Sequence, residues 1–298
     1  MHKIPVFVRV ILVLLASTLV ACTVYPFFYG FTQNWIGAYE SGRVFRRVWM
    51  IAVILGLIIS ARWLGMRPPT QVGYRLHRGW FRNLALGTVI AWVFLGLVAF
   101  VYRQIGAWQP STDQDWMEEV LTGFLRGAAV AGIEEYIFRG MIFLSMCQRW
   151  SWQRAAVVSS LIFSSLHFLE GRGIFDGPPD AWWSGFAICG TMLGAMAQRI
   201  TLFPDAASLF VVGMILCYAL IKTGTLWYSV GLHGGWVWAS SVLSDAHDRT
   251  GEIDLFWIGG SRMYDGVIPF AGMLIVLPLT IWLMRLGWLA REAEGSPE

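Results

Sequence analysis

The stretch NLALGTVIAWVFLGLVAFVY, residues 83–102, contains twenty residues and not one charged side chain. A helix of about 20 apolar residues crosses a hydrocarbon core of about 30 Å, so this run predicts a transmembrane helix. Comparable apolar runs recur along the 298-residue chain, at about 10–30, 48–64, 120–148, 154–170, 206–222, 224–244 and 266–288. The sequence therefore predicts an all-α fold, a polytopic transmembrane helical bundle with about eight spans.

The composition indicates that lipid is the main solvent of the chain. Hydrophobic residues make up 56% of it and charged residues only 14%, against roughly 25% charged residues in an ordinary soluble domain. The net charge of +3 comes largely from Arg in short loops, which bears on membrane topology and provides no basic groove for nucleic acid. We expect a multi-pass integral membrane protein of a bacterial or archaeal cell membrane. It should be embedded in the lipid bilayer and should not bind nucleic acid.

One segment, Trp182–Gln198, decides between eight spans and nine. It is barely long enough to cross and is rich in Gly, with Gly190 and Gly194 in a GxxxG arrangement that favours close helix packing. Short cytoplasmic loops accumulate Lys and Arg, which places the Arg-rich loop 67–82 inside. If Trp182–Gln198 does not cross the membrane, both termini are cytoplasmic, and this is the topology we prefer.

The predicted spans divide the chain into three parts. Residues 1–119 form the N-terminal transmembrane spans, residues 120–244 form a core that contains the intramembrane ionisable groups, and residues 245–298 form an acidic loop with the C-terminal span. The four Cys residues lie in apolar stretches at unrelated spacings, which argues against a disulfide framework and against a thiolate metal site.

Ionisable side chains within membrane spans are expensive to bury, and they are therefore candidates for function. Glu134, Glu135 and Arg139 lie midway along the predicted span 120–148. Glu135 and Arg139 are four residues apart with the acid first, the favourable order for an ion pair on a helix. We therefore assign Glu135 and Arg139 a structural, supporting role. Glu134 points about 100° away from Glu135 and needs a partner on another helix.

Two histidines lie in other predicted spans. Glu134 precedes Arg149 by 15 residues and His167 follows Arg154 by 13, so both rise about 20 Å from the same helical turn and lie at similar depth. His233 lies in the sequence GLHGG, where small residues allow a neighbouring backbone or a substrate to approach closely.

These groups admit both structural and catalytic explanations. Each could be polar glue between helices, but the cost of burying so many ionisable groups favours catalysis or ion transport. Away from bulk water a carboxylate is a competent base, so Glu134 with His167 could activate water against a peptide carbonyl while His233 donates to the oxyanion. We expect no cofactor. Zinc is the rival account, since one carboxylate and two imidazoles also form a catalytic ligand set, and Glu134, His167 and His233 would then be its ligands.

The order of the motifs resembles a known family of intramembrane proteases. EExxxR at Glu134–Arg139 and FxxxH at Phe163–His167 are similar to the first two motifs of the CAAX prenyl endoprotease and bacteriocin-processing family, over about residues 120–240. The resemblance implies that Glu134 and His167 activate water and that His233 forms an oxyanion site with an Asn four residues later. This chain has Val237 there, and loss of one oxyanion donor typically costs about 10² to 10³ in rate.

The resemblance implies an intramembrane endopeptidase that acts on a membrane-anchored or hydrophobic protein substrate. Prenylated CAAX substrates are implied only by the name of the family. Val237 motivates an alternative, a catalytically impaired, protease-derived membrane binding or immunity protein. A transporter that uses Glu134 and Arg139 is a third hypothesis, and the lack of a visible inverted repeat counts against it.

Overall fold

The computed structural model describes residues 4–35, 40–65, 69–111, 116–167, 175–200, 203–259, 263 and 265–289. The predictions that involve Arg67, residues 168–170 and the C-terminal residues after 289 lie outside these ranges. Helices dominate the described part, which confirms the all-α class. Contacts within the chain divide it into two compact units, residues 1–66 with 165–201 and residues 67–164 with 202–298.

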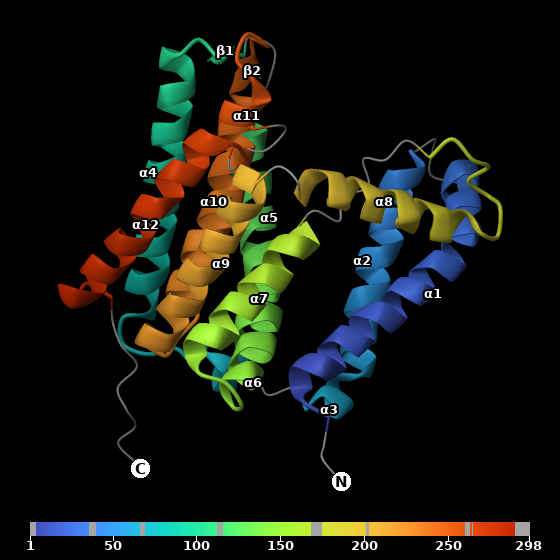
Figure 1. Ribbon diagram of the computed structural model, residues 1–298, viewed down its shortest axis with the longest axis horizontal. Coiled ribbons are helices and arrows are strands. Elements are labelled where there is room, and N and C mark those ends of the chain that lie inside the picture. Colours follow the sequence, from blue (N-terminus) through green and yellow to red (C-terminus); the bar gives the residue numbers. More distant parts are fainter. Residues whose placement is uncertain are drawn as a thin grey trace. The chain divides into compact units, whose positions relative to one another are not determined.

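The first unit is built on two long helices and one that crosses them. It contains α1 (Val6–Trp35), α2 (Ser41–Ile59), α3 (Ala61–Leu64) and α8 (Ser184–Ile200). Gly185 of α8 lies directly on the backbone of Cys22 in α1, where a Cβ atom would collide with the Cys22 carbonyl oxygen. The absent side chain at Gly185 therefore allows α8 to lie across α1 and α2 (Figure 1).

The second unit contains the remaining elements. They are η1 (Pro69–Val72), α4 (Trp80–Gln104), β1 (Trp108–Pro110), α5 (Trp116–Glu135), η2 (Tyr136–Phe143), α6 (Leu144–Cys147), α7 (Trp152–His167), α9 (Phe203–Thr223), α10 (Trp227–Asp245), β2 (His247–Arg249), α11 (Leu255–Ile258) and α12 (Val267–Arg285). The boundary between the units falls after Ser164, inside the last turn of α7. Because α7 is continuous through His167, this helix fixes the place of that residue.

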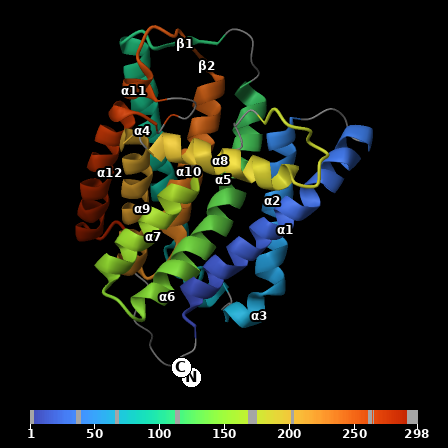
Figure 2. The same ribbon diagram turned by 45° about the vertical axis from the view of Figure 1, so that its right-hand side comes forward.

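Helix α10 packs against α4 and α5 through glycines. Gly231 faces α4, where a Cβ atom would collide with the carbonyl oxygen of Leu84. A Cβ atom on Gly127 of α5 would lie 2.5 Å from the carbonyl oxygen of Gly234 in α10. Small residues thus let both neighbours approach the backbone of α10, as expected for helices packed in lipid. In Figure 2 α10 is flanked by α4 and α5.

Four helices are long and apolar enough to cross a membrane, namely α1, α4, α9 and α12. The protein is accordingly an integral membrane protein. Helices also occupy the other predicted spans: α2 with α3, the continuous run α5–η2–α6, α7 and α10. The segment Trp182–Gln198 lies largely in α8, whose apolar part is shorter than the four long helices. The number of crossings and their orientation stay predictions.

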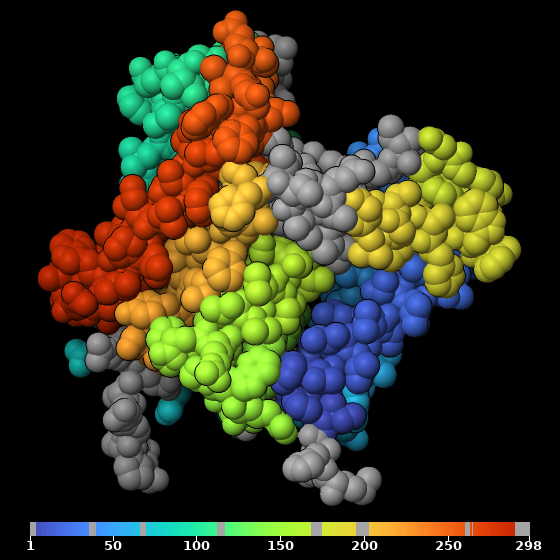
Figure 3. Space-filling view, viewed as in Figure 1, coloured from blue at the N-terminus to red at the C-terminus, as the bar shows by residue number. Residues whose placement is uncertain are grey.

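Helix α9 is the most enclosed of the four long apolar helices. In its most apolar window 56% of the residues are buried, whereas the corresponding fraction in α1, α4 and α12 is between 28% and 33%. The space-filling view shows α9 between α12 and α7 on one face of the second unit (Figure 3). The hydroxyl of Ser164 in α7 donates to the carbonyl oxygen of Ala206 in α9 at 2.9 Å, which ties these two helices together.

Two short strands were not predicted from the sequence. Strands β1 and β2 pair in antiparallel fashion, with Gln109 opposite Asp248. The hydroxyl of Thr250 also donates to the carbonyl oxygen of Gly106 at 2.7 Å. The pair joins the loops that follow α4 and α10, and its polar residues show no alternating apolar pattern in the sequence.

The contact between α5 and α10 yields a stability prediction. Gly127→Ala should destabilise the protein by about 1–3 kcal/mol, because the new methyl group meets the backbone of Gly234 and cannot be accommodated by a side-chain movement. Gly132→Ala is the matched control on the same helix, since nothing lies within 4 Å of its Cβ position. It should be neutral or stabilising by up to about 1 kcal/mol through helix propensity. Thermal unfolding in detergent measures both, and equal midpoints would contradict the close packing.

Candidate active site

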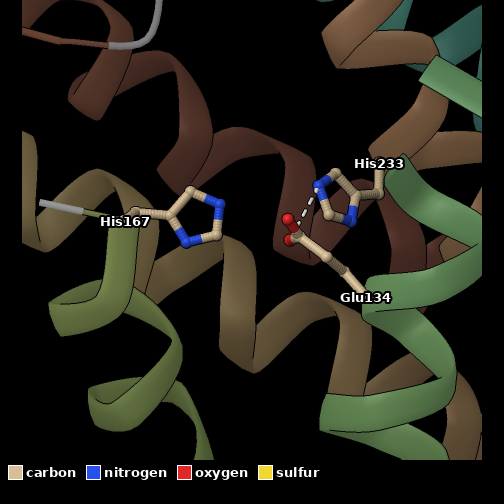
Figure 4. Close-up of side chains that lie close together, drawn as sticks. All are labelled: Glu134, His167 and His233. Carbon is tan, nitrogen blue, oxygen red and sulfur yellow. Dashed lines mark ion pairs between the residues drawn. The ribbon is translucent and has the colours of Figure 1, made fainter. Parts of the chain in front are cut away.

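The structure brings together the three residues that the sequence predicts to be catalytic. Glu134 lies near the C-terminal end of α5, His167 is the last residue of α7, and His233 lies in the middle of α10. One ligand atom of each residue lies within 4.8 Å of the other two. Figure 4 shows the Glu134 carboxylate between the two imidazole rings. The depth argument from the sequence thus predicts the meeting of Glu134 and His167 correctly.

The imidazole of His233 lies between two carboxylates. Its Nδ1 atom is 2.9 Å from Oε1 of Glu135, and its Nε2 atom is 3.8 Å from Oε2 of Glu134. The first distance is a hydrogen bond and the second is too long for one. Glu135 is fully buried, whereas the side chain of Glu134 is 30% exposed. Glu135 is therefore enclosed by protein, whereas the side chain of Glu134 is partly exposed.

The predicted ion pair between Glu135 and Arg139 is present. Nη1 of Arg139 donates to Oε1 of Glu135 at 3.1 Å, and both side chains are almost completely buried. A buried guanidinium needs a counter-charge, because leaving either partner alone costs several kcal/mol. The sequence argument did not show that the same oxygen of Glu135 also contacts His233. Residues 98 positions apart share no local pattern that could reveal this contact.

Phe163 connects the ion pair to the histidine. The guanidinium carbon of Arg139 lies 4.2 Å from the centre of the Phe163 ring, a cation–π contact that gains strength away from water. The same ring meets His233 edge-on at a centroid distance of 5.9 Å. Phe163, the first residue of the FxxxH motif, thus contacts both Arg139 and His233 one helical turn before His167. The spacing of the motif in the sequence does not reveal these contacts.

The helix that contains the two glutamates changes its winding directly after them. Residues Tyr136–Phe143 form a π-helical segment, in which the backbone N–H of Leu144 bonds to the carbonyl oxygen of Arg139, five residues earlier. Such segments are rare and frequently mark functional sites. A Cβ atom on Gly140, within this segment, would lie 3.2 Å from the side chain of Val72, so the absent side chain lets η1 pack closely against the wider turn. Apolar periodicity cannot distinguish this winding from an ordinary α-helix.

Tyr74 supports the same helix from a loop distant in sequence. Its hydroxyl donates to the carbonyl oxygen of Gly132 at 2.6 Å, and its ring meets that of Trp227 edge-on. Burial, together with the negative charge of Glu135, raises the pKa of Tyr74 well above its usual value, so the hydroxyl keeps its proton. Tyr74 is a site residue that the sequence analysis missed, because nothing local links it to Glu135.

A comparison with known families matches this part of the molecule. The family model described as type II CAAX prenyl endopeptidase, Rce1-like, matches residues 116–239, from the start of α5 into α10. This segment is therefore similar to the CAAX protease family. It contains Glu134, Glu135, Arg139, His167 and His233, and the resemblance drawn from the sequence motifs is confirmed. Neither a curated protein nor a solved structure matches the chain.

The segment that matches this family model also presents a donor set that suits a metal ion. Glu134, His167 and His233 provide one carboxylate oxygen and two imidazole nitrogens, the set found in several catalytic zinc sites. The contact of Glu135 with Nδ1 of His233 is the kind of outer-shell carboxylate that orients a histidine ligand. When bound, a zinc ion would supply Lewis-acid polarisation and a more acidic water molecule.

The position that departs from the CAAX protease motif lies on α10. Val237 is half-buried and follows His233 by one helical turn, so the two side chains share a face of the helix. Among the described residues, the buried Nε1 atom of Trp236 has no hydrogen-bond partner. The indole N–H of Trp236, three residues after His233, is thus one donor available on α10, although its sequence position is not that of the family's Asn.

Val237→Asn should raise the cleavage rate or leave it unchanged. The amide at position 237 can donate to the same oxyanion as His233. Adding such a donor to a site that lacks one should raise the rate by about 10². Cleavage and thermal stability would be measured beside Val237→Ala, which removes the bulk of the valine without adding a donor. A well-folded Val237→Asn protein with cleavage lowered a hundredfold, and normal cleavage by Val237→Ala, would show that the oxyanion site lies elsewhere.

Proposed function

We propose that the chain is an intramembrane endopeptidase in which Glu134, assisted by His167, activates water against a peptide bond. The observation that carries this proposal is the position of the Glu134 carboxylate between the imidazoles of His167 and His233, on a side chain that is 30% exposed. A base must lie within hydrogen-bond reach of the proton that it removes. Three atoms within 4.8 Å of one another can each lie about 2.8 Å from one water oxygen.

The proposed reaction assigns a task to each of the three residues. Glu134 takes a proton from the attacking water, while the electron pair of the broken O–H bond forms the bond to the carbonyl carbon. His167 orients the water from the side opposite His233. The carbonyl oxygen becomes an oxyanion, which His233 can stabilise when its Nε2 atom has a proton. The C–N bond then breaks and the amine leaves with a proton from the site.

A membrane-anchored or hydrophobic protein is the substrate class that suits this site. The catalytic groups lie on helices α5, α7 and α10 of an integral membrane protein, so the scissile bond has to reach them within or beside the bilayer. The family description names CAAX prenyl endopeptidases, and a prenylated C-terminal peptide is therefore the first substrate to try. Val237 supports one alternative, a protease-derived binding or immunity protein that has lost cleavage.

Replacement of Glu134 provides the central test of the proposed function. Glu134→Gln should lower cleavage of a quenched fluorescent, farnesylated CAAX peptide by at least about 10², because the amide cannot accept the proton of water. The fold should stay intact, since Glu134 is partly exposed. Glu118→Gln, the same substitution at an exposed position of α5, is the matched control and should cleave like the wild type.

If the peptide is not cleaved by the wild type, the membrane proteomes of cells that contain the wild type or Glu134→Gln would be compared for new protein ends. Fragments that depend on Glu134 identify a natural substrate. Identical proteomes from both strains, with both proteins folded and inserted, would contradict the endopeptidase and favour the binding or immunity protein.

Chelation separates a metal-free mechanism from a zinc-dependent one. We expect cleavage to survive removal of divalent ions by EDTA or phenanthroline, because Glu134 and His167 suffice to activate water. Metal content of the purified protein would be measured in parallel. Loss of activity that one equivalent of zinc restores would instead make Glu134, His167 and His233 the metal ligands.

A further inference from the structure

A cavity of about 540 Å³ lies at one end of the second unit, where Figure 1 shows α6. It is bounded by η1 and the residues that follow it, by α6 and by the end of α9. Its polar lining includes Thr70, Gln71 and Arg75, which are exposed, whereas Val72 and Leu220 in its apolar lining are buried. The cavity therefore combines a cation and hydrogen-bonding groups on its exposed side with an apolar, buried side.

The ends of two long apolar helices place this cavity at the level of the lipid headgroups. Helix α4 begins at Trp80 and α9 ends at Thr223, and the cavity is lined by residues directly outside or within the last turn of these two helices. The rings of Trp80 and Trp227 lie 4.9 Å apart, and the ring of Tyr74 lies 5.5 Å from that of Trp227. Trp and Tyr gather where a membrane protein meets the headgroup layer.

The charge of the segments around the cavity is positive. All nine lining residues come from the stretches 41–112, 136–169 and 206–244, none of which contains an acidic residue. A planar guanidinium binds phosphate through paired hydrogen bonds, and anionic lipids are attracted to basic residues at the membrane surface. Besides Arg75, the basic residues in or next to the helix ends that surround the cavity are Arg78, Arg82, Arg149 and Lys222.

We propose that the cavity binds the headgroup of an anionic phospholipid, with Arg75 as the ligand of its phosphate, and that the bound lipid stabilises the backbone that supports the active site. The hydroxyl of Thr70 and the amide of Gln71 are further hydrogen-bond donors for the headgroup. The apolar side of the cavity suits the first methylene groups of the lipid chains. Binding is independent of the proposed endopeptidase function, and only the effect on cleavage rests on it.

The wall of the cavity is tied to the helix that contains Glu134. The hydroxyl of Tyr74 donates to the carbonyl oxygen of Gly132 at 2.6 Å, two residues before Glu134. Val72, whose side chain is 4% exposed, packs on the π-helical segment at Gly140. The residues from Val72 to Tyr74 thus contact the cavity on one side and the backbone before and after Glu134 on the other.

The same segment is also tied to the start of α10, which contains His233. The backbone N–H of Leu226 donates to the carbonyl oxygen of Gly73 at 2.8 Å, and Nε1 of Trp227 donates to the carbonyl oxygen of Arg75 at 2.9 Å. One short segment therefore lines the cavity and supports the two helices that provide Glu134 and His233. A ligand that binds only the closed arrangement of this segment suppresses its local opening by mass action.

Lipid binding can be measured without any substrate. Full-length protein in an uncharged detergent would be titrated with phosphatidylglycerol, and the bound lipid would be counted by native mass spectrometry. We expect it to bind at least about fivefold more tightly than phosphatidylcholine with the same chains, which has no net charge. Glycerol 1-phosphate, the same phosphate ester without chains, should bind at least about tenfold more weakly. Equal binding of glycerol 1-phosphate would make a free phosphate ester the ligand and overturn the assignment to a lipid.

Substitutions at Arg75 and Arg78 separate a built site from diffuse attraction. Arg75→Gln should lower the affinity for phosphatidylglycerol about fivefold, while Arg75→Lys should keep most of it. Both retain the carbonyl oxygen that Trp227 contacts. Arg78→Gln is the matched control on the same exposed loop, and because Arg78 does not line the cavity it should change the affinity by no more than about twofold. Equal losses in Arg75→Gln and Arg78→Gln would refute the site.

Amide hydrogen exchange tests the link to the active site. With phosphatidylglycerol at about ten times its Kd, exchange of residues 132–143 through local opening should slow by about tenfold in the wild type and much less in Arg75→Gln. Unchanged exchange in the saturated wild type would refute the link. In nanodiscs of phosphatidylcholine, added phosphatidylglycerol should raise cleavage of the farnesylated peptide in the wild type and not in Arg75→Gln. Slower exchange with no cleavage in any membrane would support the lipid site and contradict the endopeptidase function alone.

Discussion

The guanidinium of Arg139 is a full charge buried within a membrane protein, and the arrangement of the core follows from the need to neutralise it. Removing one partner of such a buried pair costs about 3–5 kcal/mol, a large part of the stability of a typical domain. Glu135 supplies the opposite charge, and the face of Phe163 supplies a second favourable contact. These partners come from α5 and α7, so the neutralisation of Arg139 also fixes the placement of both helices beside α10.

The same constraint explains why the motif contains two adjacent glutamates with different tasks. Successive residues on a helix point about 100° apart. Glu135 is therefore directed into the protein toward Arg139 and His233, while Glu134 is directed toward the partly open side that His167 also faces. The carboxylate of Glu135 contacts Arg139 and His233, whereas that of Glu134 is available for the proposed chemistry. A single glutamate could not meet both demands, because the carboxylate that pairs with Arg139 is enclosed by protein and inaccessible to a substrate.

Patterns along the chain predict those features that depend on local geometry. Apolar run lengths predict the helices, the spacing of Glu135 and Arg139 predicts their ion pair, and equal distance from a helical turn predicts that Glu134 meets His167. The contact of Glu135 with His233, the support from Tyr74 and the pairing of β1 with β2 join segments far apart in sequence. The π-helical segment has no distinct residue pattern, so it too emerges only from the packing around it.

The pairing of β1 with β2 brings two segments that are distant in the sequence together at one end of the second unit. Residues 108–110 and 247–249 lie side by side although about half of the chain separates them. An antibody raised against this end of the folded protein would therefore recognise a discontinuous epitope, and peptides from either strand alone would bind it poorly. Because the two strands follow directly from α4 and α10, such an antibody would also report whether those helices are correctly assembled in cells.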